Sequence, residues 1–258
     1  MSFSRWWIPR RISQASILGL IASPLLGMSF FRGNLAAADL FGAPLADPLA
    51  FLQALIGGRV LVFSYLISAL VVTAFYFILG GRSFCGWICP VGLITELGDK
   101  LRSRLGSGGT TIPLSANRWS LVMVLLVVAV TGIPLFEVFS PISIVSRAIA
   151  FASFTPLLVL AAILLVETAV ARRVWCRSLC PLGGFYSLLA RFSPVRVGFV
   201  TDRCTGCGNC LSVCPVEEVL SSPLERGEQQ VTAGDCTRCL ACLDSCPSKA
   251  LKIDLFYK

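Results

Sequence analysis

Four long apolar stretches dominate the first three quarters of the chain. They cover residues 12–31, 60–79, 120–139 and 153–171, and shorter polar segments separate them. Each is about 20 residues long, the length at which a helix crosses the roughly 30 Å hydrocarbon core of a bilayer. The second holds neither charge nor proline, whereas Pro24 and Pro134 interrupt the first and third. The pattern predicts a mostly α-helical protein built on a four-transmembrane-helix bundle.

Composition and charge agree with this pattern. The chain of 258 residues is 55% hydrophobic and only 14% charged, which is too apolar for a soluble domain of this length. The net charge is +8, and its positive excess lies in residues 1–195, which carry +9, whereas residues 196–258 carry −1. Lys and Arg gather before the first stretch, between the second and third, and after the fourth. The positive-inside rule then predicts a multi-pass protein with both termini in the cytoplasm. Such charge favours contact with membrane lipid, so no nucleic-acid partner is predicted.

The cysteine content narrows the chemistry. The chain has 12 cysteines and no histidine. The absence of histidine excludes haem with two histidine ligands, c-type haem attachment and zinc sites that contain histidine. The cysteines gather in tight clusters, a pattern that favours iron–sulfur ligation over disulfide bonds or nucleophilic catalysis.

Two matching cysteine runs occupy the C-terminal quarter. CTGCGNCLSVCP at 204–215 and CTRCLACLDSCP at 236–247 both read C-x2-C-x2-C-x3-C-P. This is the run of bacterial two-cluster ferredoxins, in which the fourth cysteine ligates the other cluster. Structural zinc is the alternative. The spacing predicts two [4Fe–4S] clusters in a domain at 196–258, held by Cys204, Cys207, Cys210 and Cys246, and by Cys236, Cys239, Cys242 and Cys214.

This C-terminal domain is expected to have an α+β ferredoxin fold. Short stretches with strand-like alternation flank it, VRVGFV at 195–200 and ALKIDLF at 250–256. Alternation of apolar and polar residues over such lengths is typical of half-buried strands. Two clusters that share crossed ligands lie close together, so the domain is expected to conduct electrons without substrate chemistry of its own.

Four further cysteines form two C-x3-C-P motifs in the domain at 1–195. FCGWICPVG contains the motif at 85–90, and WCRSLCPLGG repeats it 91 residues later, at 176–181. Each motif follows a pair of apolar stretches and precedes an amphipathic segment, so the domain is interpreted as a duplicated helical hairpin. The thiols of Cys85, Cys89, Cys176 and Cys180 could hold a third iron–sulfur centre or a metal ion, form redox-active disulfides, or pack as reduced thiols.

Two acidic residues also fall near the ends of the apolar stretches. Glu137 lies in the third stretch and Glu167 in the fourth. Either they are solvated at the edge of the bundle, or they handle protons beside a redox site, since ionisable residues within apolar spans are functional candidates.

The order of these motifs resembles the NapH/MauN family of polytopic membrane ferredoxins, and within it most closely the NapH branch of periplasmic nitrate reductase systems. The likeness extends to GNLAAADLFGAPLADPLAFLQAL at 33–55. The resemblance implies a bacterial inner-membrane location and two [4Fe–4S] clusters. It also implies a quinol dehydrogenase component, which passes electrons from the quinol pool to a periplasmic ferredoxin of the NapG type and on to nitrate reductase.

Two other functions remain open at the level of the sequence. The chain could be an assembly or maturation factor that reduces a metal ion or a disulfide through its C-x3-C-P thiols, or a purely structural anchor that docks a soluble partner. The same motif also occurs in nitrous-oxide reductase regulators of the NosR type and oxidase-assembly ferredoxins of the CcoG type. The pathway served, and any enzymatic activity beyond that of an electron-transfer subunit, are therefore not assigned.

Overall fold

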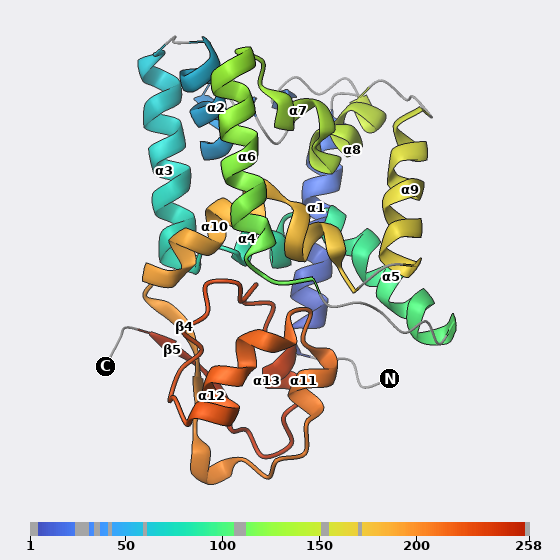
Figure 1. Cartoon of the computed structure of the whole chain (residues 1–258), viewed down its shortest axis with the longest axis vertical. Coiled ribbons are helices and arrows are strands. Elements are labelled where there is room, and N and C mark those ends of the chain that lie inside the picture. Colours follow the sequence, from blue (N-terminus) through green and yellow to red (C-terminus); the bar gives the residue numbers. More distant parts are fainter. Residues whose placement is uncertain are drawn as a thin grey trace. The chain divides into compact units, whose positions relative to one another are not determined.

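A computed structural model describes residues 5–23, 31–33, 37–40, 43–58, 61–105, 112–150, 155–169 and 172–255. The chain divides into two compact units (Figure 1). Unit 1 consists of Met1–Ala15, Phe75–Ile88 and Tyr186–Lys258, and unit 2 consists of Ser16–Ala74 and Cys89–Phe185. The unit that contains the C-terminal cysteine runs therefore also includes two short segments from earlier in the chain.

Helices form most of unit 2, together with a small antiparallel sheet in the order β1-β2-β3. In the sheet, Phe31 pairs with Leu40 and Ala37 pairs with Ala46. Helix α5 packs against α9, α2 packs against α6, and η2 lies against both α5 and α6. Helices α1, α3 and α10 continue into unit 1. The elements are α1 (Trp7–Ala22), β1 (Phe31–Gly33), β2 (Ala37–Leu40), β3 (Ala43–Ala46), α2 (Pro48–Gly58), α3 (Phe63–Leu79), α5 (Val91–Leu105), α6 (Ala116–Thr131), α7 (Leu135–Phe139), α8 (Pro141–Ala150), α9 (Thr155–Ala169), the π-helix η2 (Trp175–Leu179) and α10 (Pro181–Phe192).

The contact between α2 and the end of α6 depends on a glycine and a buried amide. A Cβ added to Gly57 would lie 2.7 Å from the carbonyl oxygen of Gly132, so only glycine allows this approach. Nearby, the backbone N–H of Phe136 donates to Oε1 of Gln53 over 3.2 Å. Gln53 has no exposed surface, and a buried amide needs such a partner. The hydrogen bond joins α7 to α2, and the close approach of the two glycines lies where α6 ends.

The helices that overlap the four predicted spans are shorter than expected. They have 16, 17, 16 and 15 residues in α1, α3, α6 and α9. At 1.5 Å per residue the longest extends about 25 Å, less than the roughly 30 Å of a bilayer core. In the third stretch, Gly132 caps α6 with a φ of 72°, and α7 begins after Pro134 as a separate helix.

The prediction of a four-transmembrane-helix bundle is therefore wrong. Within the described ranges, no helix combines the length and the apolar character that crossing a membrane requires. The multi-pass inner-membrane location and the cytoplasmic termini, which rested on those spans, are wrong with it. Parts of the predicted spans, at 24–30, 60, 153–154 and 170–171, lie outside the described residues.

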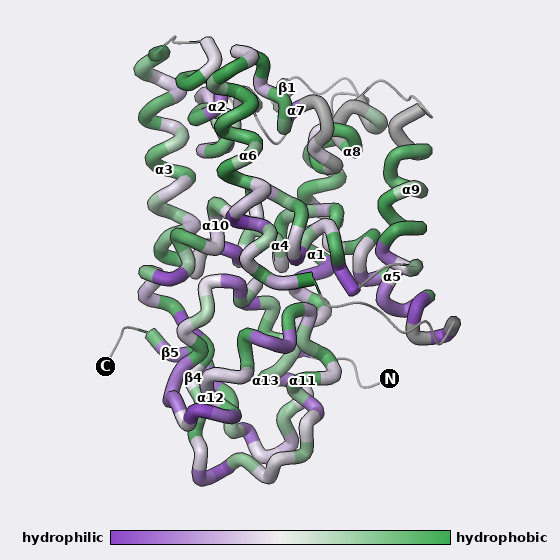
Figure 2. Tube along the Cα trace, viewed as in Figure 1, coloured by the Kyte–Doolittle hydropathy of each residue, from purple (hydrophilic) through white to green (hydrophobic). Residues whose placement is uncertain are grey.

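The apolar stretches still form helices, with many large side chains on their surfaces. Figure 2 shows the apolar character of α3, α6 and α9. Phe63 on α3 is 70% exposed, Val130 on α6 is 86% exposed and Leu158 on α9 is 72% exposed. The core of unit 2 thus takes only part of the apolar surface of these helices.

A two-stranded antiparallel sheet forms the base of unit 1. Strand β4 (Val195–Phe199) pairs with β5 (Leu251–Leu255), so the two strands predicted from alternation are confirmed. The N–H of Val231 donates to the carbonyl of Val197 over 2.8 Å and brings a third segment to β4. Short helices complete the unit, namely α4 (Ser83–Trp87), η3 (Thr201–Arg203), α11 (Asn209–Val213), η4 (Glu217–Leu220), α12 (Ser221–Arg226) and α13 (Ala241–Asp244).

A buried ion pair attaches the 75–88 segment to the second cysteine run. Arg82, only 1% exposed, donates to Oδ1 of Asp235 over 3.0 Å and to the Asp235 carbonyl over 3.3 Å. The indole N–H of Trp87 donates to the carbonyl of Arg238 over 2.9 Å. A Cβ on Gly86 would come within 2.8 Å of the Thr237 carbonyl oxygen. Helix α4 therefore packs directly on the loop 235–239.

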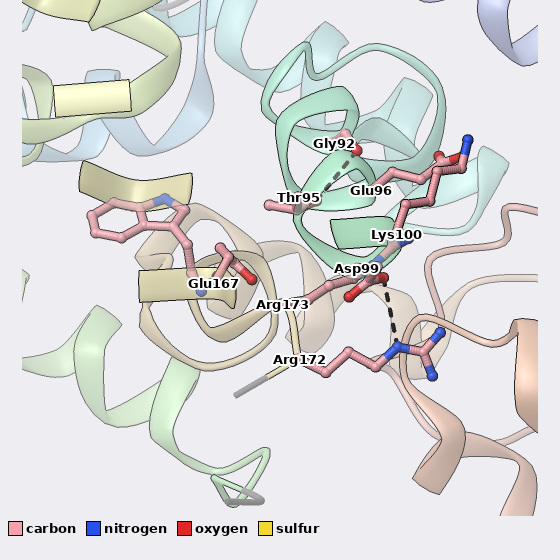
Figure 3. A network of polar contacts seen from close by, with 9 residues as sticks. Gly92, Thr95, Glu96, Asp99, Lys100, Glu167, Arg172 and Arg173 are labelled. Atoms are coloured by element: carbon pink, nitrogen blue, oxygen red, sulfur yellow. Dashed lines mark hydrogen bonds and ion pairs between the residues drawn. The ribbon is translucent and has the colours of Figure 1, made fainter. Parts of the chain in front are cut away.

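Unit 2 contains a buried carboxyl group at the end of α9 (Figure 3). Glu167 is 2% exposed, and its Oε1 accepts a hydrogen bond from the Trp175 N–H over 3.0 Å. Among the described residues its Oε2 has no hydrogen-bond partner. Nearby, Asp99 on α5 accepts from Nε of Arg173 over 2.6 Å and lies 3.5 Å from Nε of Arg172. Glu167 is therefore buried, so of the two alternatives left open by the sequence, a solvated side chain does not apply to it.

Burial raises the pKa of Glu167 from 4.5 to about 7, and the charge of Asp99 adds to this effect. The Trp175 N–H and Arg173 act in the opposite direction. Between these two pH values the folded protein keeps a proton that the unfolded chain has released. The free energy of unfolding therefore falls as the pH rises through this window.

Replacing Arg82 by alanine should leave the Asp235 carboxylate buried without its counter-charge. Breaking a buried pair in this way costs about 3–5 kcal/mol. The apparent unfolding temperature, followed by circular dichroism, should fall by about 6–20 °C. As a control, Lys100→Ala removes the exposed partner of Glu96 and should change it by about 2 °C at most. Equal shifts in the two variants would contradict a structural role for the buried pair.

Replacing Glu167 by glutamine should remove the pH dependence that this carboxyl contributes. The free energy of unfolding of the variant, relative to that of the parent, should rise by about 3 kcal/mol between pH 4.5 and pH 8. Denaturant titrations at several pH values measure this difference. Glu96→Gln on the neighbouring α5 is the matched control and should follow the parent. Parallel profiles of parent and Glu167→Gln would show that Glu167 ionises normally.

Candidate functional site

Two cavities in unit 1 are each lined by four cysteines. The first is open and has a volume of about 730 Å³, and its lining includes Cys204, Cys207, Cys210 and Cys246. The second is small, about 20 Å³, and its lining includes Cys214, Cys236, Cys239 and Cys242. Each set takes three cysteines from one run and the fourth from the other. The fold thus brings together the same two groups of four that the spacing predicts as ligands.

Both runs make the same pair of backbone turns. In the first run Gly206 and Gly208 adopt left-handed φ values of 70° and 72°. In the second run the equivalent positions, 32 residues later, are Arg238 and Leu240, with φ values of 47° and 60°. Glycine reaches this conformation freely, whereas other L-residues adopt it at a cost in free energy. The turns make each loop wrap its cavity, and the second run does so without glycine.

The donor set of each cavity fits a four-iron cluster. All twelve cysteines lie in the described part of the chain, and there none of them forms a disulfide bond. In the part of the chain that the structure describes, no three Cys, Asp or Glu side chains are close enough to hold a single metal ion. Four cysteines in the lining of one cavity provide the number and kind of ligands that a [4Fe–4S] cubane requires. These residues could therefore hold one cluster in each cavity.

The two sets differ in exposure and in electrostatic environment. Cys207 of the first set is exposed, whereas Cys214 and Cys242 of the second are buried. Burial raises the pKa of Cys242, as do the neighbouring thiolates. At Cys246, burial acts in the same direction, but hydrogen bonds from Ser248 and the Ala250 N–H outweigh it and lower the pKa. The second cavity is thus the drier site, which makes its charges interact more strongly.

The C-x3-C-P cysteines fall in different parts of the fold. Cys85 lies on α4 in unit 1, and the other three belong to unit 2. Cys180 immediately precedes Pro181, the first residue of α10, and its carbonyl accepts from Gly184 N–H over 3.1 Å. Proline is favoured at this first helical position. The expected convergence of all four thiols stays a prediction.

The two motifs differ locally in a way that the sequence repeat does not predict. Around Cys85 the chain is α-helical, with Ile88 N–H donating to the Phe84 carbonyl over 3.0 Å. Around Cys176 it forms the π-helix η2, and Cys180 N–H donates to the Trp175 carbonyl five residues earlier, over 2.8 Å. Short π-helical turns are frequent at functional sites.

Sequence reasoning missed the charged residues around the two cysteine sets. Arg238 lines the second cavity, and Glu217, Glu218 and Glu225 line the first. A third cavity of about 300 Å³, mostly apolar, shares Val197, Arg238 and Leu240 with the second. Aligning the two cysteine runs would have revealed an arginine opposite a glycine, but nothing local shows that this arginine is buried.

Comparison with known proteins agrees with this arrangement of cysteines. A family model described as a 4Fe-4S binding domain matches twice, at residues 61–107 and 153–199, and each match contains one C-x3-C-P motif. A model described as a 4Fe-4S dicluster domain matches residues 196–247, which include both C-terminal runs. No solved structure matches the chain.

Three relatives cover nearly the whole chain. The methylamine utilization ferredoxin-type protein MauN of Methylorubrum extorquens is 35% identical over 97% of this chain and 89% of its own length. The MauN protein of Methylobacillus flagellatus is 37% identical over 97% and 91%, and the ferredoxin-type protein NapH of Escherichia coli is 34% identical over 96% and 89%. These identities confirm the resemblance seen in the motifs, and the chain belongs to the NapH/MauN family of ferredoxin-type proteins.

Proposed function

We propose that this iron–sulfur electron-transfer protein conducts single electrons through two [4Fe–4S] clusters held by the two crossed cysteine sets of unit 1. The observation that carries the proposal is the lining of each cavity by three cysteines of one run and one of the other. When bound, each cluster supplies reversible one-electron redox chemistry. The four thiols hold it, and the packing of Cys214 and Cys242 keeps water from the second cavity.

Exposure favours different tasks for the two sets. Cys207 of the first set reaches the surface, where a protein redox partner could approach. The second set is buried beside the apolar cavity that Val197, Arg238 and Leu240 also line. We therefore assign exchange with the partner to the first set. The second set would exchange electrons with a donor in the apolar cavity.

The donor that suits this cavity is a quinol. Its lining combines aromatic and aliphatic side chains with the polar groups of Ser13, Ser83, Arg196 and Arg238. A few hydrogen-bonding groups in an otherwise apolar pocket of this size are typical of small-molecule sites. Oxidation of a quinol releases two electrons and two protons, and the electrons leave one at a time through the clusters.

The relatives suggest two candidate routes for the final electron acceptor. The NapH likeness favours a NapG-type ferredoxin and nitrate reductase, and we keep this route as a proposal. The MauN relatives, named for methylamine utilization, match with similar identities. An electron route in amine oxidation is therefore the alternative.

The crossed ligand sets can be tested with pairs of cysteine-to-serine changes. Cys210→Ser combined with Cys246→Ser removes two ligands of one proposed cluster, so the protein should lose about four iron atoms. Cys242→Ser combined with Cys246→Ser removes one ligand from each cluster and should lose about eight. Iron and acid-labile sulfide are counted on anaerobically purified protein. The reverse order of the two losses would show that each run ligates its own cluster.

The donor can be tested by titrating the anaerobic protein with a water-soluble quinol during electron paramagnetic resonance. We expect cluster signals to appear with quinol. Ile253→Trp, which fills the apolar cavity, should slow their appearance at least about tenfold, equivalent to about 1.4 kcal/mol. Reduction by dithionite should stay unchanged. Leu255→Trp is the control, because Leu255 lies on the same strand outside that cavity. No response to quinol, with rapid reduction of Cu²⁺ or a disulfide instead, would favour an assembly factor.

A further inference from the structure

We propose that Arg238 is a buried counter-charge that raises the reduction potential of the cluster held by Cys214, Cys236, Cys239 and Cys242. The inference rests on the two-cluster function proposed above. It assigns an electrostatic role toward the cluster to a residue that is not an iron ligand and that also lines the apolar cavity. Its basis is the placement of one uncompensated positive charge in the wall of the second cavity.

The guanidinium of Arg238 is fixed inside unit 1 by neutral acceptors. The residue is 6% exposed. Its Nε donates to the carbonyl of Val195 over 2.9 Å, Nη1 to that of Cys236 over 3.1 Å and Nη2 to that of Ala190 over 3.1 Å. All three partners are backbone carbonyls, and within the described part of the chain no carboxylate pairs with it. The side chain therefore satisfies its hydrogen bonds while keeping its full charge.

A second buried arginine nearby differs from Arg238 in that a carboxylate neutralises its charge. Arg82 also lies against this loop, but the carboxylate of Asp235 neutralises it at 3.0 Å. Arg196 is a further positive charge that acts on Arg238 and does not neutralise it. Among the described residues that line the second cavity, Arg238 is therefore the side chain that contributes a positive charge.

The backbone at this position gives an independent observation. Arg238 has a φ of 47°, where the first run has Gly206 with a φ of 70°. A non-glycine residue in this region is strained, and such strain persists where the surrounding structure holds it. The three hydrogen bonds of the guanidinium hold it here. Glycine would adopt this turn with less strain, so the turn itself does not require an arginine.

The two cavities differ in the sign of their lining charges. Among the residues that the structure describes, the first is lined by Glu217, Glu218 and Glu225 and by no basic residue. With the same restriction, the second is lined by Arg238 and by no acidic residue. Reduction adds one electron to an anionic cluster and its four thiolates, and no bond or proton changes. A nearby positive charge stabilises the reduced form, and more strongly where water is excluded.

This charge offsets the effect of burial. Removing water from an anionic cluster disfavours its reduced, more negative form and lowers its potential. The second cavity is the drier one, so its cluster would otherwise accept electrons less readily than the first. Arg238 raises its potential again, which allows an electron from the proposed donor to pass through the second cluster to the first.

The test uses the full-length chain with Cys210→Ser and Cys246→Ser, in which only the second cluster remains. Reductive titrations followed by electron paramagnetic resonance give its midpoint potential. Arg238→Gln should shift the one-electron equilibrium at least about tenfold toward the oxidised form, which is a fall of about 59 mV. Arg238→Lys keeps the charge and should recover at least half of this shift. Arg196→Gln removes an arginine that lines the apolar cavity but not the cysteine cavity. It should shift the midpoint potential by less than half as much as Arg238→Gln does.

An unchanged midpoint in Arg238→Gln at full iron content would overturn the proposal, as would an equal fall in Arg238→Lys. If the glutamine variant loses its iron, Arg238→Met decides instead. It removes the charge but keeps an unbranched side chain, so its midpoint should fall by at least about 59 mV, and an unchanged midpoint at full iron content would overturn the proposal. The potentials are set with a chemical reductant, so quinol oxidation can fail without affecting this result. Absence of iron from the parent double variant would instead contradict the proposed function.

Discussion

The crossing of cysteines between two runs of sequence is the constraint on which unit 1 depends. Cys246 must reach the cavity of the first run and Cys214 that of the second. Neither can do so unless the two runs fold against each other. The pairing of β4 with β5 brings the ends of the domain together, and α11 packs against α13. The crossed ligands therefore bring the two proposed clusters close together, which suits electron transfer between them.

Electrostatics then makes the two halves of this symmetric arrangement unequal. Two arginines are buried against the second run, and they act differently because Asp235 neutralises only Arg82. That pair attaches the 75–88 segment to the loop and contributes stability, whereas Arg238 keeps its charge. The first cavity has glutamates in its wall and an exposed cysteine. A duplicated motif thus provides two sites of different electrostatic character.

Features that depend on local spacing could be predicted from the sequence, and features that depend on distant partners could not. The cysteine sets and the flanking strands depend on residues a few positions apart, so pattern alone places Cys204, Cys207 and Cys210 together. The apolar stretches also form helices. Their lengths were overestimated because hydropathy averages over the left-handed cap at Gly132 and the break at Pro134. The burial of Glu167 and Arg238 depends on partners 8 to 48 residues away, and no local pattern indicates it.

The central claim is that two clusters with crossed ligands lie side by side in one small unit. The most direct measurement is electron paramagnetic resonance of the chemically reduced protein at increasing degrees of reduction. Two paramagnetic [4Fe–4S] clusters at such proximity should interact, so the spectrum of the half-reduced protein should broaden and split as the second electron enters. Two spectra that simply add, without any sign of coupling, would contradict crossed ligation and the electron path that follows from it.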